Sequence, residues 1–173
     1  MNRLKIFIDG SVDPKTRTGF GAALFISPLL TSQPLPSLES LKPRVKTCQF
    51  ENTSSTRLEL QTLLWALSHI DKPDTKIDIY TDCQNLLGLY ARRGRLEKNN
   101  YLSSKNQCLQ NADLYQQYFQ LCDQFEVKLI KVDGHKTSLL RDENDHLFAL
   151  VDKACRKALR NHNVQPPKSS PVL

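Results

Sequence analysis

The chain has 173 residues, of which 39% are hydrophobic and 24% are charged, a composition that suits one globular domain and leaves little chain for a second. No uninterrupted apolar run approaches the roughly 18 residues that a membrane span needs. The formal net charge of +6 permits a polyanionic partner without requiring one. These properties exclude general disorder and a membrane-spanning protein.

The first residues do not have the pattern of a secretory signal. Arg3 and Lys5 are followed by a short apolar run that ends at Asp9, whereas a signal needs a longer apolar stretch and a small-residue cleavage site. We therefore expect a cytoplasmic protein. The five cysteines are widely spaced and form no CxxC pair, so we expect buried or unreactive thiols rather than disulfides or structural zinc.

Three predicted strands come first along the chain. Their largely apolar runs cover residues 4–8, 19–26 and 45–51. Between the second and the third, the segment Ser27–Pro43 contains four prolines, which predicts a loop or a loosely ordered insertion. Such an insertion is either a contact surface or simple loop growth, and we favour loop growth.

The rest of the chain alternates helices and strands. Helices are predicted at 56–70, 84–92, 112–124 and 144–161, and strands at 76–81 and 127–132. Hairpin connections followed by crossovers indicate an α/β domain with a mixed five-stranded sheet flanked by helices. We expect one domain over residues 1–162 and a flexible C-terminal tail over residues 163–173.

Acidic side chains stand at the ends of predicted elements. Asp9 and Asp82 each follow a strand, and Glu59 lies in the first turn of the clearest helix. If the two strands are adjacent and parallel, both aspartates lie at the sheet edge where ligands gather in α/β folds. Clustered carboxylates repel one another, and hard cations such as Mg2+ relieve that repulsion. A pair of such ions can serve phosphodiester hydrolysis.

Each acid also has a simpler interpretation. Asp9-Gly10 could be an ordinary turn, and Thr56-Arg57-Leu58-Glu59 matches a capping box. Asp82 could cap the next helix, and Asp152 could be a surface acid. Composition and periodicity leave these alternatives open.

Six motifs together resemble the ribonuclease H family, in its order and spacing, over roughly residues 3–160. They are Ile6-Phe7-Ile8-Asp9-Gly10-Ser11 with Gly19-Phe20-Gly21-Ala22-Ala23, Thr56-Arg57-Leu58-Glu59-Leu60, Ile79-Tyr80-Thr81-Asp82-Cys83-Gln84, Asn111-Ala112-Asp113-Leu114, Val132-Asp133-Gly134-His135 and Val151-Asp152-Lys153-Ala154. The resemblance implies the ribonuclease H-like fold. It also implies an endonuclease that cuts the RNA strand of RNA–DNA hybrids with two Mg2+ or Mn2+ ions.

The resemblance also assigns roles to residues. The metal ligands would be Asp9, Glu59, Asp82 and Asp152. His135 would assist proton transfer or product release, unless it is an ordinary loop histidine, and Gln84 would read the minor groove of the hybrid. Phosphate of the DNA strand would be bound by Ser54, Ser55 and Thr56, for which helix capping is the alternative.

The chain departs from the family pattern in two places that affect these roles. Phe148 stands where the family has an asparagine before the fourth acid, which makes Asp145 a competitor of Asp152. The basic protrusion that grips the hybrid is not plain. Arg92, Arg93 and Arg95 lie in its interval, and a solvated charged loop is the alternative.

A basic stripe adds to these observations. Lys153, Arg156, Lys157 and Arg160 share one face of the last predicted helix, where they either contact phosphate or are simply solvated. Three hypotheses follow. The first is a monomeric metal-dependent ribonuclease acting on hybrids, the second a nuclease of this fold that cuts DNA junctions, and the third a non-catalytic nucleic-acid-binding module.

Overall fold

The computed structural model describes residues 3–31, 34–134 and 136–164. Its centre is a five-stranded sheet with the order β3-β2-β1-β4-β5. The strands are β1 (Leu4–Asp13), β2 (Thr18–Ile26), β3 (Lys46–Phe50), β4 (Lys76–Thr81) and β5 (Glu126–Lys131). Strand β2 pairs antiparallel with β1 and β3, whereas β4 pairs parallel with β1 and β5. The predicted mixed sheet is confirmed.

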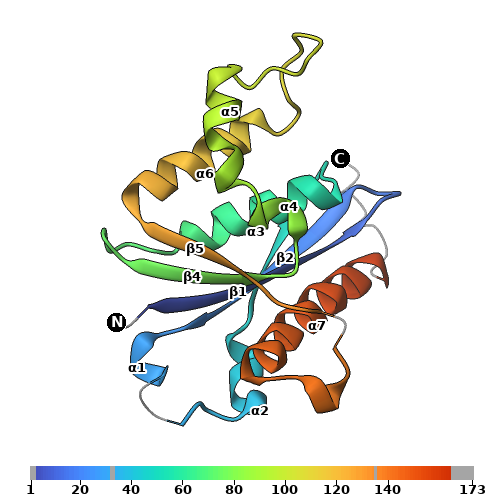
Figure 1. The fold of residues 1–173 in the computed structure, drawn as a ribbon. Helices are drawn as coiled ribbons and strands as arrows, with labels where there is room; N and C mark the ends of the chain where they lie inside the picture. Colours follow the sequence, from blue (N-terminus) through green and yellow to red (C-terminus); the bar gives the residue numbers. More distant parts are fainter. Residues whose placement is uncertain (1–2, 32–33, 135, 165–173) are drawn as a thin grey trace, which may run out of the picture.

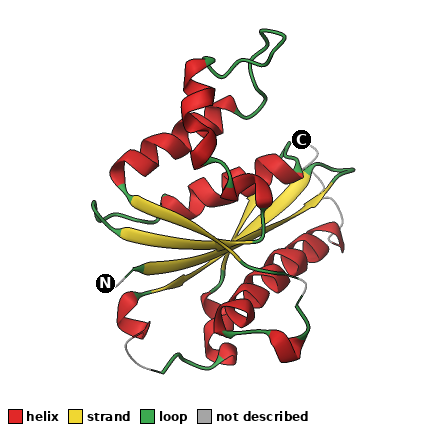
Figure 2. Cartoon of the chain, viewed as in Figure 1, coloured by secondary structure: helices red, strands yellow, loops and turns green. Residues whose placement is uncertain are grey.

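Helices cover both faces of this sheet (Figures 1 and 2). One face carries α3 (Ser55–Leu67), α4 (Gln84–Leu87) and α6 (Ala112–Gln124), and the other carries α1 (Pro28–Thr31), α2 (Leu38–Leu41) and α7 (Glu143–Val164). Helix α5 (Arg93–Lys98) stands away from the sheet beyond α6. Three 3-10 turns complete the elements: η1 (Lys42–Arg44), η2 (Tyr90–Arg92) and η3 (Ser138–Leu140).

The alternation of side chains along β1 supplies both hydrophobic cores. Ile6 and Ile8 pack with Leu63 of α3, whereas Phe7 points to the opposite face and packs with Val151 of α7. All five side chains are fully buried. Burial of each such side chain contributes about 1.5–3 kcal/mol, so β1 is held firmly from both sides. The strand that carries Asp9 is therefore the most rigid platform in the fold.

The predicted loop over Ser27–Pro43 is wrong in part, because α1, α2 and the first residues of η1 lie within it. Ser37 caps α2 by accepting a hydrogen bond from the amide of Ser40. Leu41 at the end of α2 is fully buried in the cluster that also contains Leu147 of α7. The prolines misled the prediction because short helices between them are stabilised by this tertiary contact rather than by local propensity.

The element boundaries differ from prediction in three further places. The helix predicted at 84–92 is divided into α4 and η2, which are separated by Gly88. Strand β1 continues to Asp13, because it pairs with β2 along its whole length. Helix α7 runs to Val164, two residues beyond the predicted domain boundary. Among the described residues, no helix is both long enough and apolar enough to cross a membrane.

Candidate active site

Asp9 lies within β1 rather than after it. Its backbone is paired with Ala22 of β2, so the interpretation of Asp9-Gly10 as a turn is wrong. The parallel pairing of β1 and β4 aligns Phe7 with Tyr80. Continued for two more residues, this register brings Asp82 level with Asp9. The condition set by the sequence, that the two strands be adjacent and parallel, is met.

Glu59 belongs to the second turn of α3, not the first. The helix is capped by Ser54, whose side chain accepts a hydrogen bond from the amide of Arg57 at 3.3 Å, so the capping box ending at Glu59 is not formed. Oε2 of Glu59 is buried and has no hydrogen-bond partner among the described residues. A Cβ atom on Gly10 would lie 3.7 Å from Oε1 of Glu59, which shows how closely this carboxylate approaches β1.

Asp82 follows β4 directly and is exposed. The cap position of α4 belongs to Cys83, so Asp82 does not cap that helix. Its carboxylate faces the loop after β5, since a Cβ atom on Gly134 would lie only 3.0 Å from Oδ2 of Asp82. Any side chain at position 134 would press on this oxygen, and glycine leaves the carboxylate room.

Asp152 comes to the site from the opposite face of the sheet, on α7. Single ligand atoms of Asp9, Asp152 and Cys155 lie within 4.8 Å of one another. The side chain of Asp152 is half-buried and its Oδ1 accepts a hydrogen bond from Arg156 at 2.7 Å. The interpretation of Asp152 as an isolated surface acid is therefore wrong, because it lies against the buried carboxylate of β1.

The electrostatics of the cluster follow from this packing. Burial, then the charges of Asp82 and Asp152, raises the pKa of Asp9 to about 8. Burial, then the charges of Asp9 and Asp82, raises the pKa of Glu59 to about 8. Ionised carboxylates at these positions are thus destabilised by one another and by lost solvation. Oxygen donors of this kind, one of them without a partner, fit a hard divalent cation.

Asp145 is occupied elsewhere. Oδ2 of Asp145 accepts hydrogen bonds from the amide of Asp142 and from Nζ of Lys136, both at 3.0 Å. Oδ1 of Asp142 in turn accepts from the amide of Asp145 at 2.8 Å. Burial opposes ionisation of Asp145, but these hydrogen bonds outweigh it and hold its pKa below the ordinary value. Asp145 caps the start of α7, and this contact set includes none of the other three acids.

The remaining predicted site residues are less closely tied to the carboxylates. His135 lies outside the described residues. Gln84 is exposed at the first position of α4, two residues after Asp82. Ser54 is the helix cap, while Ser55 is exposed and Thr56 half-buried in the first turn of α3. A role of Gln84, Ser54, Ser55 or Thr56 toward nucleic acid stays a prediction.

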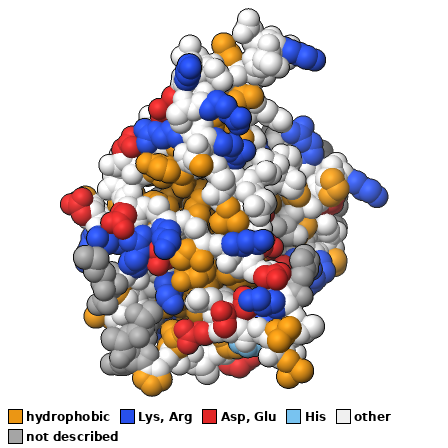
Figure 3. All heavy atoms as spheres, in the orientation of Figure 1, with side chains coloured by type: hydrophobic (Ala, Val, Ile, Leu, Met, Phe, Trp, Pro, Cys, Tyr) orange, Lys and Arg blue, Asp and Glu red, His pale blue; other side chains and the backbone are white. Residues whose placement is uncertain are grey.

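The three arginines predicted for a basic protrusion differ in what they contact. Arg93 donates to both carboxylate oxygens of Asp123, at 2.6 and 2.9 Å, and to Glu97 at 2.7 Å. Arg92 donates to the carbonyl of Asn85 at 2.7 Å. Arg95 is exposed and makes no ion pair within the described residues. Lys and Arg side chains gather over the upper part of the molecule, where α4, α5 and α6 lie (Figure 3).

Sequence reasoning missed two residues that shape the site. Cys155 is fully buried, with Sγ 3.7 Å from Oδ2 of Asp9. Arg57 joins α3 to the start of α6 through Asp113, with an Nη2–Oδ2 distance of 3.0 Å, and so fixes the helix that carries Glu59. Position i+3 from Asp152 on a helix was the available signal for Cys155. No local pattern indicates the partner of Arg57.

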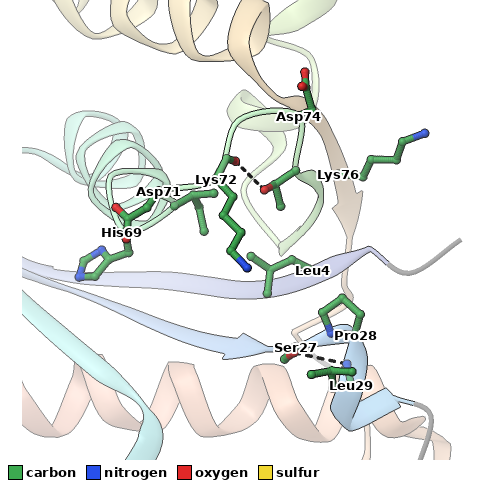
Figure 4. A pocket seen from close by; sticks show the side chains of 11 residues that line it. Leu4, Ser27, Pro28, Leu29, His69, Asp71, Lys72, Asp74 and Lys76 are labelled. Carbon is green, nitrogen blue, oxygen red and sulfur yellow. Dashed lines mark hydrogen bonds between the residues drawn. The ribbon is translucent and has the colours of Figure 1, made fainter.

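A cavity of about 750 Å³ lies at the other end of the sheet (Figure 4). Its lining includes Leu4 and Lys76, the first residues of β1 and β4, together with Ile70 after α3. Asp9 and Asp82 lie at the opposite ends of these strands. The cavity is therefore separate from the carboxylates.

Comparison with known proteins adds the following matches. The model of the RNase H family matches residues 1–159. Ribonuclease H from Caldicellulosiruptor saccharolyticus is 30% identical over 108 residues, which cover 61% of this chain and 74% of that protein. Ribonuclease H from Thermoanaerobacter sp. (strain X514) is 27% identical over 121 residues, covering 68% of this chain and 72% of that protein.

Two solved structures share the fold. The foamy viral protease-reverse transcriptase in complex with dsDNA matches with a TM-score of 0.61 and 10% identity, covering 90% of this chain and 96% of that chain. The native protease-reverse transcriptase of Prototype Foamy Virus matches with a TM-score of 0.65 and 13% identity, covering 90% of this chain and 20% of that longer chain. At these identities the likeness concerns the fold alone.

Proposed function

Because the chain belongs to the RNase H family and is a ribonuclease H, we propose that it hydrolyses the RNA strand of RNA–DNA hybrids by a mechanism that uses two divalent metal ions. The observation that carries this proposal is the meeting of acids from β1, α3, β4 and α7 around Asp9. Four separate elements contribute one carboxylate each, and none of the four acids caps a helix.

The proposed ligands of the ions are Asp9, Glu59, Asp82 and Asp152. Mg2+ or Mn2+ suits this set, because all four side chains offer carboxylate oxygens and Oε2 of Glu59 has no partner among the described residues. When bound, such ions lower the pKa of an attacking water and stabilise the charge that develops on the phosphate. Asp9 is the central member, since its charge affects the pKa of Glu59 and it lies beside Asp152.

The chain's own residues would position the substrate. Gln84 is exposed beside Asp82 and is proposed to contact the minor groove of the hybrid. Ser55 and Thr56, in the first turn of α3, are proposed to bind a phosphate of the DNA strand with the free amide groups of that turn. Arg95 is proposed to contact phosphate farther along the duplex. His135 is proposed to assist proton transfer or product release.

The test is cleavage of a labelled RNA–DNA hybrid by the purified protein with Mg2+. We expect cuts in the RNA strand only, and we expect Asp9→Asn to abolish them while the circular-dichroism spectrum is unchanged. Lys72→Gln is the matched control, because Lys72 is exposed at the opposite end of the sheet.

Two results would contradict the proposal. If the hybrid remains intact while DNA junctions are cut, the protein is a nuclease with another substrate. If every nucleic acid remains intact but the hybrid still binds, the protein is a binding module. Both results are read with the same preparation, so a loss of fold is recognised separately.

A further inference from the structure

We propose that a basic groove between α7 and the segment before β3 binds a single nucleic-acid strand that extends from the hybrid at the active site. This proposal rests on the proposed function and adds a second contact for its substrate. The groove has a volume of about 310 Å³, and its polar lining consists of Lys42, Lys153, Lys157, Thr47 and Asn161. Below, it is called the lysine groove.

The charge of the lysine groove is uncompensated. Lys42, Lys153 and Lys157 are all exposed, and none of them forms an ion pair with a carboxylate in the described part of the chain. Among the described residues that line the groove, none is acidic. Three like charges held together raise the local potential and attract a polyanion.

The insertion Ser27–Pro43 holds the first of these lysines in place. Leu41 is fully buried against α7, and Lys42 follows it directly at the start of η1. Lys42 therefore lies at a fixed position over the helix that carries Lys153 and Lys157. The insertion contributes a charged wall to a groove, which a mere lengthening of a loop would not do.

The second half of α7 connects the active site to the lysine groove. After Asp152 the helix carries four cations and no acid up to Val164, the last residue described. Arg156 contacts Asp152 itself, and Lys153 and Lys157 line the groove. A helix with its side chains is about 10–12 Å across. Three or four nucleotides span that distance at about 3.4 Å each.

The size and lining of the groove favour a single strand over a duplex. A volume of about 310 Å³ between a helix and one sheet edge accommodates one backbone with its sugars, not a double helix. Leu150, Ala154 and Ala158 provide an apolar floor between the lysines. A floor of this kind suits sugars and unstacked bases, while the ammonium groups suit phosphates.

The experiment compares two substrates on the inactive Asp9→Asn protein, by fluorescence anisotropy with Mg2+. One is a blunt RNA–DNA hybrid, and the other is the same hybrid with a single-stranded extension of about eight nucleotides, tested at the 5′ and the 3′ end. We expect one extension to tighten binding at least about five-fold. In Lys153→Gln/Lys157→Gln the ratio of the two dissociation constants should fall to about one, and Lys42→Gln should remove part of the advantage.

The control is Lys72→Gln/Lys128→Gln, which removes the same charge from exposed positions away from α7 and should keep the ratio. The salt dependence gives a second measure, since each lost phosphate contact on a single strand lowers the slope by about 0.7. If neither extension tightens binding, or if the groove variant keeps the advantage, the proposal is wrong.

Two further outcomes separate this proposal from others. If the groove variant loses binding to phosphatidylserine vesicles while the substrate ratio is unchanged, the groove contacts a lipid surface and the proposal is wrong. Cleavage of the blunt hybrid by the parent protein tests the proposed function independently. The groove can thus fail while the proposed function stands.

Discussion

Sγ of Cys155 lies 3.7 Å from Oδ2 of Asp9, on the side where α7 packs against β1. The same sulfur lies 3.2 Å from the carbonyl of Asp152. The thiol is fully buried, and burial, with the charges of Asp9 and Asp152, raises its pKa. A small neutral group thus separates the two carboxylates at their base and sets how deeply α7 is seated.

Enlarging Cys155 should therefore harm catalysis more than stability. We expect Cys155→Ala to cost about 1–2 kcal/mol of unfolding free energy and to keep hybrid cleavage within a few-fold. Cys155→Leu should cost a similar 1–3 kcal/mol through overpacking, but should lower cleavage at least ten-fold by separating Asp9 from Asp152. Chemical denaturation and steady-state cleavage, measured on both variants, check this. Equal activity of the two variants would contradict it.

The identity of the fourth acid is tested by a pair of substitutions. We expect Asp152→Asn to lower cleavage at least one hundred-fold with little change in melting temperature. Asp145→Asn should keep cleavage but cost about 1 kcal/mol, because it weakens the cap of α7 and the contact with Lys136. Kinetics and thermal unfolding of both variants provide the measurement. If only Asp145→Asn eliminates cleavage, our assignment of Asp152 is wrong.

The metal-free protein should lose stability as the pH rises. Asp9 and Glu59 have pKa values raised to about 8 in the fold, so they remain protonated there at a pH where the unfolded chain has released its protons. Their contribution is fully present below about pH 4 and is lost as the pH rises through 8. We expect the melting temperature in EDTA to fall by several degrees between pH 5 and pH 9.

Asp9→Asn provides the control for this pH effect. Its melting temperature in EDTA should exceed that of the parent at pH 9 and should depend less on pH, because one member of the repelling cluster is neutral. Added Mg2+ should narrow the difference between the two proteins at high pH. Parallel curves of melting temperature against pH for parent and variant would show that the cluster does not repel.

Arg93 and Arg95 form a matched pair within α5. We expect Arg95→Gln to weaken hybrid binding and to lower the salt dependence by about one phosphate contact, without a change in stability. Arg93→Gln should instead cost about 1 kcal/mol of stability, since it breaks contacts with Asp123 and Glu97. Anisotropy at several salt concentrations, together with chemical denaturation, separates the two effects. The reverse pattern would exclude Arg95 as a hybrid contact.

Much of the fold could be predicted because its signals are local. The apolar run ending at Asp9 predicts β1, and the leucines of residues 56–70 predict α3 to within three residues of its end. The helices around Leu41 could not be predicted, because their stability comes from α7, which lies more than 100 residues farther along the chain. The break at Gly88 also depends on packing rather than on a strong local signal.

The site shows a similar division. Alternation and spacing indicated that Asp9 and Asp82 stand near strand ends, and the register of β1 with β4 confirmed their adjacency. The sequence alone could not decide whether Glu59 closes a capping box, because Ser54 and Thr56 are both acceptable caps and only the observed hydrogen bond to Arg57 distinguishes them. Nor could it decide between Asp145 and Asp152, whose partners come from other segments.

The distance along the chain between Asp9 and Cys155, 146 residues, has a consequence for the timing of synthesis. On the ribosome, β1, α3 and β4 emerge well before α7, so a growing chain carries three of the four acids while the face of β1 that receives Asp152 is still uncovered. Helix α7 completes both the hydrophobic core and the set of four acids in one event. A nascent protein of this architecture therefore has no complete catalytic centre until translation has passed this helix.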